Sequence, residues 1–257
     1  MTTLQNENGY LLLQNFDVAN SSKEQLALME EGVDEMLSVL QECAEANYHV
    51  LTSVVPASGI EPFTEWSHYP DSDVHDPGNG SIWFYHAHAQ EEDEERPWDE
   101  HGHFHLFVYS DFVKDGIEPI AAPENGDPEK GGLTHLVAIS FNNAALPTRI
   151  FTTNRWVADE WLYPADAVIP LVDRFKIEKQ KGKDTDEYSL TSRWLAACLK
   201  LYRPQIEWAL QARDEKIAEI RSKVENFAED QDYEVLSAVE FDLGQQIDAI
   251  ETASNAA

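Results

Sequence analysis

Cysteine is scarce in this sequence. The 257 residues include two cysteines, Cys43 and Cys198, which lie far apart within patterns typical of apolar helices. Free thiols in such positions usually pack as small core side chains. A disulfide framework, and the oxidising compartments in which one forms, are therefore not indicated. We predict that both thiols are reduced.

Basic residues are also few. Lysine and arginine number 18 against 48 aspartates and glutamates, which gives a formal net charge of −30. Such a charge repels phosphate backbones and anionic membrane surfaces, so the sequence predicts no nucleic-acid partner and no membrane partner. One run of basic side chains between Arg174 and Lys183 is the exception. It could attract an anionic substrate or an acidic patch of a partner.

Long apolar runs are absent as well. No stretch of about 18 uncharged apolar residues occurs, and residues 1–9 contain neither the basic segment nor the apolar segment of a secretory signal. These absences predict a cytoplasmic protein that does not span a membrane.

Histidine, in contrast, is concentrated in one part of the chain. Five of the nine histidines fall within twenty residues, in two alternating runs: His86 and His88, then His101, His103 and His105. Alternate residues of a strand point to the same face of a sheet, so each run would present a row of imidazoles. Both runs adjoin segments rich in aromatic and β-branched residues, 81–85 and 106–109, which strands favour. We expect two histidine strands separated by an acidic loop.

Helices are expected at both ends of the chain. Apolar residues recur at three- and four-residue steps from about residue 22 to 47, after a capping box formed by Ser21 and Glu24. Two further helical patterns close the chain, at about 190–228, with a break near Pro204, and at about 232–252.

The middle of the chain predicts strands and loops. Residues 56–80 are rich in proline and glycine and predict a long loop. Residues 133–141 and 148–153 predict two strands of a hairpin. The fold class that follows is α+β, with a central, largely antiparallel sheet that carries the histidine strands and is flanked by N- and C-terminal helices. We expect a flexible N-terminus over 1–20, a single α+β metal-binding domain over 21–228, and a C-terminal helical arm over 229–257 that could form a homodimer.

A transition metal would explain imidazoles gathered in rows. Neutral imidazole is a good ligand for iron, copper and zinc, and two histidines at alternate positions can reach one ion. We predict His86, His88 and His103 as the first ligands, with His105 and Glu100 next. His101 begins its strand and is the weakest candidate ligand. Iron or copper is favoured and zinc is a further choice, because imidazole-rich open coordination with aromatic walls suits an oxidation slightly better than a hydrolysis.

Three residues are candidates for catalysis beside the metal. Glu100 directly precedes the second histidine run, and His135 could be a general base, a remote ligand or a structural hydrogen-bonding residue. Arg155 stands beside Trp156 and could clamp a carboxylate, or it could pair with Asp159 on the first turn of a helix. His49, His68 and His75 are interpreted as incidental.

Two short motifs resemble known families. Gly80-x5-His86-x-His88-x3-Glu92 resembles the first half of the first cupin motif, which implies a metal bound by histidines and a glutamate. That motif's later glycine is Asp99 here, and its second motif is absent. The run from His101 to His105 resembles the histidine-triad signature of nucleotide hydrolases and transferases, which implies that His103 attacks a phosphate. Gly102 departs from that pattern.

A third resemblance is broader. The segments 84–88, 100–105 and 151–156 together resemble an uncharacterised bacterial family, a domain of unknown function, over about residues 25 to 210. The resemblance implies no activity, but it suggests that Asn154, Arg155 and Trp156 belong with the histidines.

The sequence thus predicts a metal-dependent enzyme, an iron- or copper-dependent oxidoreductase that acts on a small molecule. Two alternatives stay open. One is a histidine-triad-like phosphoryl or nucleotidyl hydrolase or transferase, and the other is a non-catalytic metal-binding protein.

Overall fold

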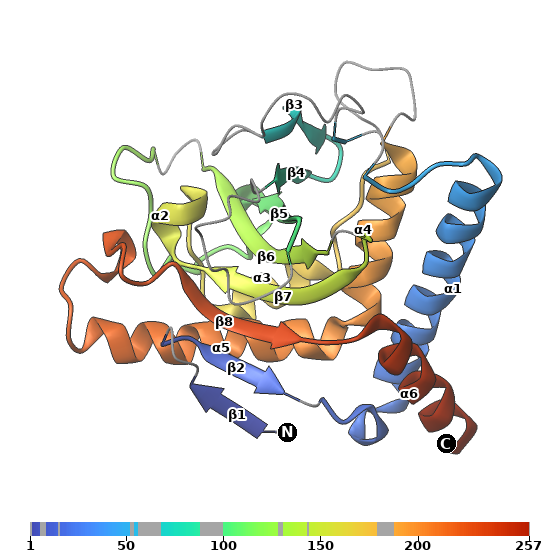
Figure 1. Ribbon diagram of the computed structural model, residues 1–257. Helices are drawn as coiled ribbons and strands as arrows, with labels where there is room; N and C mark the ends of the chain where they lie inside the picture. Colours follow the sequence, from blue (N-terminus) through green and yellow to red (C-terminus); the bar gives the residue numbers. More distant parts are fainter. Residues whose placement is uncertain are drawn as a thin grey trace, which may run out of the picture.

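The fold is built on one eight-stranded sheet (Figure 1). The computed structural model describes residues 2–5, 9–14, 16–51, 54–55, 68–87, 100–127, 131–142, 144–178 and 188–256. The strand order is β1-β2-β8-β7-β6-β5-β4-β3, and every neighbouring pair is antiparallel except β2 and β8. The strands are β1 (Thr2–Gln5), β2 (Leu11–Gln14), β3 (His68–Asp76), β4 (Ser81–Ala87), β5 (Gly102–Tyr109), β6 (Leu133–Phe141), β7 (Pro147–Thr153) and β8 (Val235–Glu240).

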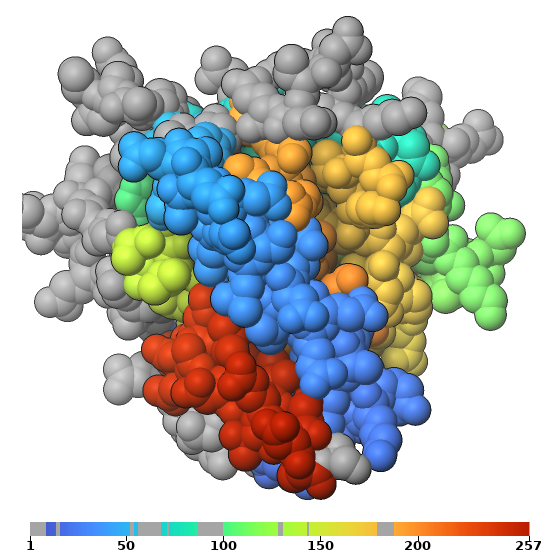
Figure 2. Space-filling view, turned by 90° about the vertical axis from the view of Figure 1, so that its right-hand side faces the viewer, coloured from blue at the N-terminus to red at the C-terminus, as the bar shows by residue number. Residues whose placement is uncertain are grey.

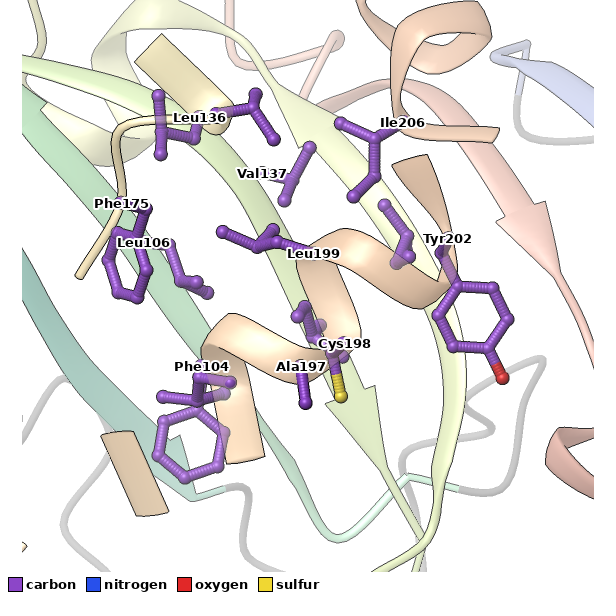
Figure 3. Packing of buried hydrophobic residues seen from close by; sticks show 14 of the residues in the cluster. Phe104, Leu106, Leu136, Val137, Phe175, Ala197, Cys198, Leu199, Tyr202 and Ile206 are labelled. Atoms are coloured by element: carbon purple, nitrogen blue, oxygen red, sulfur yellow. The ribbon is translucent and has the colours of Figure 1, made fainter. Parts of the chain in front are cut away.

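The longer helices pack on one face of this sheet, and the short helix that contains Ala158 packs against Phe84 and Phe107 on the other face. In the described part of the chain the helices are α1 (Lys23–Glu45), α2 (Arg155–Ala158), α3 (Ala165–Val172), α4 (Ser189–Leu201), α5 (Arg203–Arg221) and α6 (Leu243–Ala256). Side chains of β5 and β6 meet α4 and the start of α5 in the main core, which includes Phe104, Leu106, Leu199 and Ile206 (Figure 3). The predicted α+β class with a largely antiparallel sheet is confirmed.

The two histidine strands are neighbours. β4 and β5 pair antiparallel, and residues of β5 alternate between the two faces of the sheet. Phe104 and Leu106 point to the helices, so His103 and His105 point to the opposite face. Nearly all residues of β5 are buried, which means that both faces of this strand are covered.

The first helix begins one residue later than the sequence predicts. Ser22, and not Ser21, caps α1, and its side chain and that of Gln25 form a reciprocal capping box. The predicted break near Pro204 is confirmed, because α4 ends at Leu201 and α5 begins at Arg203.

Three segments differ from the secondary structure predicted for them. Residues 68–76, predicted as loop, form β3, and residues 2–5 and 11–14 near the N-terminus form β1 and β2. The helix predicted over 232–252 was wrong in its first half, because Val235–Glu240 form β8 between β2 and β7. Pairing with two strands from distant parts of the chain stabilises an extended conformation there, whatever the local helical pattern.

Both cysteines are free and buried, as predicted. Among the described helices, none combines the length and the apolar character that a bilayer crossing needs. The C-terminal α6 packs against α1 of the same chain.

Candidate metal centre

Three histidines converge on the sheet face opposite α4 and α5. His86 on β4 is the register partner of His103 on β5, and His105 stands two residues further along the same strand. One ligand atom from each of the three rings lies within 4.8 Å of the others. A metal bound to imidazoles at about 2.0–2.1 Å in tetrahedral geometry separates its ligand nitrogens by about 3.3 Å. The group is therefore close to the arrangement that could hold one ion.

A chain of hydrogen bonds runs through the two histidines of β5. Glu100 Oε1 lies 2.6 Å from His103 Nδ1, and His103 Nε2 lies 3.0 Å from His105 Nε2. His105 Nδ1 lies 3.1 Å from His135 Nε2, on β6. Two of the three candidate ligands thus have a polar side chain behind them. Such partners orient metal-binding imidazoles.

The carboxylate at one end of the chain is itself held in place. Glu100 is buried, and its second oxygen accepts a hydrogen bond of 2.7 Å from Ser140 Oγ. Ser140 is the register partner of His103 on the next strand. If Glu100 is ionised it can only accept, so His103 Nδ1 then carries the proton and Nε2 is the nitrogen left to bind a metal.

Burial lowers the pKa of three imidazoles: those of His86, His105 and His135. It lowers the pKa of His86 to about 4, with a further contribution from the neighbouring His103. Complete burial lowers the pKa of His105 well below its ordinary value. It lowers the pKa of His135 to about 3, assisted by Arg213. Neutral imidazole is the form that binds metals, so the lowered pKa values of His86 and His105 favour metal binding at neutral pH.

A buried carboxyl group supports the far end of the chain. Glu160 Oε2 accepts a hydrogen bond of 2.8 Å from the backbone N–H of His135. Desolvation raises the pKa of Glu160 to about 8, although Arg213 opposes this shift. Glu160 is therefore mostly protonated at neutral pH. No sequence motif predicted its hydrogen bond to the backbone of His135.

Aromatic rings surround the three histidines. The Phe84 ring lies 5.1 Å from the His105 ring, and the Phe151 ring lies 5.1 Å from the His103 ring, centroid to centroid. Ala138 is the register partner of both His105 and Phe151, and it places a small side chain between them. Part of the wall of the centre is therefore apolar.

A buried arginine lies on β7, beside Ser140 and in line with His103 across the sheet. Arg149 on β7 pairs with Ser140 and is almost fully buried. Its guanidinium lies 4.7 Å from the centroid of the Phe151 ring and 5.2 Å from that of Tyr10. Desolvation lowers its pKa, and the neighbouring Tyr10 and Glu100 oppose that effect. No motif in the sequence marks Arg149 as part of the centre.

The structure places two other candidate residues away from this group. His101 Nδ1 lies 2.7 Å from Tyr85 Oη, and Tyr85 belongs to the core on the helix side. Arg155 donates to both carboxylate oxygens of Glu229 and to Asp159, with Nη1–Oδ1 at 2.8 Å. The pair of Arg155 and Asp159, one of the two arrangements expected from the sequence, is therefore present.

The remaining candidates fall into two groups. His88 lies outside the described residues, as does Glu92 of the motif that resembles the cupin family. His68, interpreted as incidental in the sequence, lies on β3 as the register partner of His86, with the two ring centroids 5.1 Å apart. Because Pro70 and the polar residues around it favour a loop, the sequence did not predict this strand.

A separate groove lies on the helix side of the molecule (Figure 2). It has a volume of about 290 Å³ and is lined by residues of α1, α4 and α5 and by the end of α3 and the turn after it, among them Leu28, Phe175 and Leu199. No residue of the histidine strands lines it, so it is not part of the candidate metal centre.

The comparisons with known proteins identify a family. A family model described as a domain of unknown function (DUF6969) matches residues 30–241. No curated protein and no solved structure gives a significant match. The predicted resemblance to an uncharacterised family is confirmed.

Proposed function

Because the chain belongs to the DUF6969 family, whose description names no activity, we propose from the centre alone that it is a metal-dependent enzyme. His86, His103 and His105 would hold one transition-metal ion. The observation that carries this proposal is the convergence of three imidazoles from two adjacent strands within 4.8 Å. Three protein ligands leave one coordination position for water, oxygen or substrate, which is the arrangement of catalytic centres.

The surroundings support catalysis more than storage. The ligands lie on paired strands, which hold side chains more precisely than loops do. In this proposal Glu100 orients the ring of His103, and His135 orients the ring of His105. An ion held this way keeps a fixed geometry and an apolar environment, whereas weak storage sites need neither.

Oxidation of a small molecule with iron or copper is the reaction that we place first. The donor set is neutral imidazole, which suits iron, copper and zinc. Phe84 and Phe151 provide the apolar walls that suit a small organic substrate. Hydrolysis with zinc uses the same ligands and is the second choice.

The histidine-triad alternative fits the geometry less well. In that chemistry His103 Nε2 would attack a phosphate, but this nitrogen lies 3.0 Å from His105 Nε2, within a group of three imidazoles that could hold one ion. The alternative also gives no role to His86, which faces His103 directly.

Metal analysis of the purified protein tests the proposal. We expect one transition-metal ion per chain, either as purified or after addition of Fe(II), Cu(II) or Zn(II) to the metal-free protein. The double variant His86→Phe with His103→Phe should not retain it, and His49→Phe, an exposed position, should bind as the wild type does. A protein that takes up none of these ions would overturn the proposal. Several ions per chain without turnover would favour storage, and metal-independent hydrolysis of a nucleotide analogue that needs only His103 would favour the histidine-triad alternative.

A further inference from the structure

A fourth imidazole extends the row of the candidate metal centre to the surface. His68 on β3, His86 on β4 and His103 on β5 are register partners in turn, so they stand side by side on one sheet face. Exposure falls along the row: the His68 side chain is 41% exposed, His86 is half-buried, and the His103 side chain is 11% exposed. His105, one step further in, is 2% exposed. Within the described residues, the row leads from solvent at β3 to the interior.

The ring of His68 is fixed by two contacts. It stacks on the Phe84 ring with a centroid distance of 3.7 Å and an interplanar angle of 5°. Its Nδ1 lies 3.0 Å from Asp73 Oδ1. Because the carboxylate can only accept, Nδ1 carries the proton and the lone pair is on Nε2. A carboxylate behind an imidazole both orients the ring and strengthens it as a metal ligand.

The steps from this ring to the centre are short. The centroid of His68 lies 5.1 Å from that of His86, which in turn lies 5.8 Å from His103 and 5.7 Å from His105. An ion leaving His68 would therefore meet His86 next. The net charge of −30 also draws cations to the surface of the protein, and Asp73 places a partly exposed negative charge beside His68.

We propose that His68 and Asp73 form a capture position, where a divalent transition-metal ion first binds before it passes to His86, His103 and His105. This inference rests on the proposed function, because it needs an ion at the three histidines. The transfer is a ligand exchange: His68 Nε2 releases the ion as a ring nitrogen of His86 binds it. The oxidation state of the ion does not change, and no covalent bond of the protein breaks.

The kinetics of Co(II) uptake test this proposal, with the absorbance of the bound ion as the signal. His68→Phe keeps a ring to stack on Phe84 but removes the ligand nitrogen, and Asp73→Asn keeps a hydrogen-bond acceptor but removes the charge. We expect both variants to slow the uptake of Co(II) and its release, by about tenfold or more for His68→Phe. The equilibrium Kd should not change, because a residue that acts only on the path affects both directions equally.

A control on the same strand separates this role from a general disturbance of β3. His75→Phe lies near the other end of the strand, where the ring packs 5.3 Å from Tyr109, and it should leave rates and Kd unchanged. Unchanged rates in His68→Phe would overturn the capture position alone. So would a weaker Kd with normal uptake, because His68 would then act at the centre itself. A wild-type protein that binds no Co(II) would overturn both this inference and the proposed function.

Discussion

His86 and His103 face each other across β4 and β5 as register partners, with their ring centroids 5.8 Å apart. Register in an antiparallel pair is fixed by the whole ladder of backbone hydrogen bonds. A shift by one residue would move one of the two rings to the helix side of the sheet. The ladder between β4 and β5 therefore determines the geometry of the candidate metal centre.

Glu100→Gln should weaken metal binding. Glu100 Oε1 lies 2.6 Å from His103 Nδ1, and its charge favours the proton on that nitrogen. Without this charge the ring can turn or change its tautomer. We expect a loss of about 10- to 100-fold in affinity, as for other groups behind metal-binding imidazoles. Competition with a chelator of known affinity would measure it. Glu215→Gln, an exposed position on α5, is the matched control, and equal affinities for both variants would contradict the role of Glu100.

Gly102→Ala should destabilise the protein. A Cβ at this position would lie against the carbonyl oxygen of His86 and 2.6 Å from Tyr85 Oη. Overpacking of this kind costs about 1–3 kcal/mol, and it would act where β4 and β5 meet. Denaturant unfolding measures the cost. Gly244→Ala in the first turn of α6 serves as the control, since its new Cβ would approach only a side-chain oxygen of Asp242, at 3.3 Å. A wild-type free energy of unfolding in Gly102→Ala would refute the close approach.

Glu160→Gln should change how stability depends on pH. The pKa of Glu160 is raised to about 8 in the folded protein from an ordinary value near 4.5. Below pH 4.5 the group is protonated in both folded and unfolded chains. Between these values the folded protein binds the extra proton, so the free energy of unfolding falls as the pH rises to about 8.

The glutamine variant keeps an acceptor for the His135 N–H but cannot ionise. Measured by urea unfolding, it should resemble the wild type at pH 5 and exceed it in stability at pH 9. The difference should be a few kcal/mol, since one pKa unit corresponds to about 1.4 kcal/mol. A difference that stays constant over this range would show that Glu160 does not titrate in this way.

Arg155→Ala should lower stability without lowering metal affinity. The side chain of Arg155 is 5% exposed, and its three nitrogens donate to Glu229 and Asp159. Loss of hydrogen bonds to charged groups typically costs about 1.5–3 kcal/mol. Thermal unfolding and metal titration would measure the two effects.

Arg193→Ala offers a comparison for the same change. Arg193 also bridges two carboxylates, Glu35 and Glu42, but it is 35% exposed. An exposed ion pair contributes about 0–1 kcal/mol, so the loss should be smaller. If Arg155→Ala instead abolished turnover of a substrate while the protein stayed as stable as the wild type, the carboxylate clamp expected from the sequence would be favoured.

Local patterns in the sequence determined much of this protein. The alternation of His101, His103 and His105 with the apolar residues around them predicted a strand, because side chains of a strand change face at every residue. The recurrence of apolar residues at three- and four-residue steps predicted α1 for the same kind of reason. The segments 84–88, 100–105 and 151–156 together also predicted membership of an uncharacterised family, which the family model confirms.

The tertiary structure alone decided which distant groups meet. Ser140 holds Glu100 across 40 residues of sequence, and Glu160 reaches the backbone of His135 across 25. His68 joins the row only because β3 pairs with β4. Backbone geometry fixes the periodicity of a strand within a few residues, so the sequence shows which side chains share a face. Strand pairing and burial depend on contacts between remote segments. Those contacts placed Glu100, Glu160, His135 and His68 around the three imidazoles.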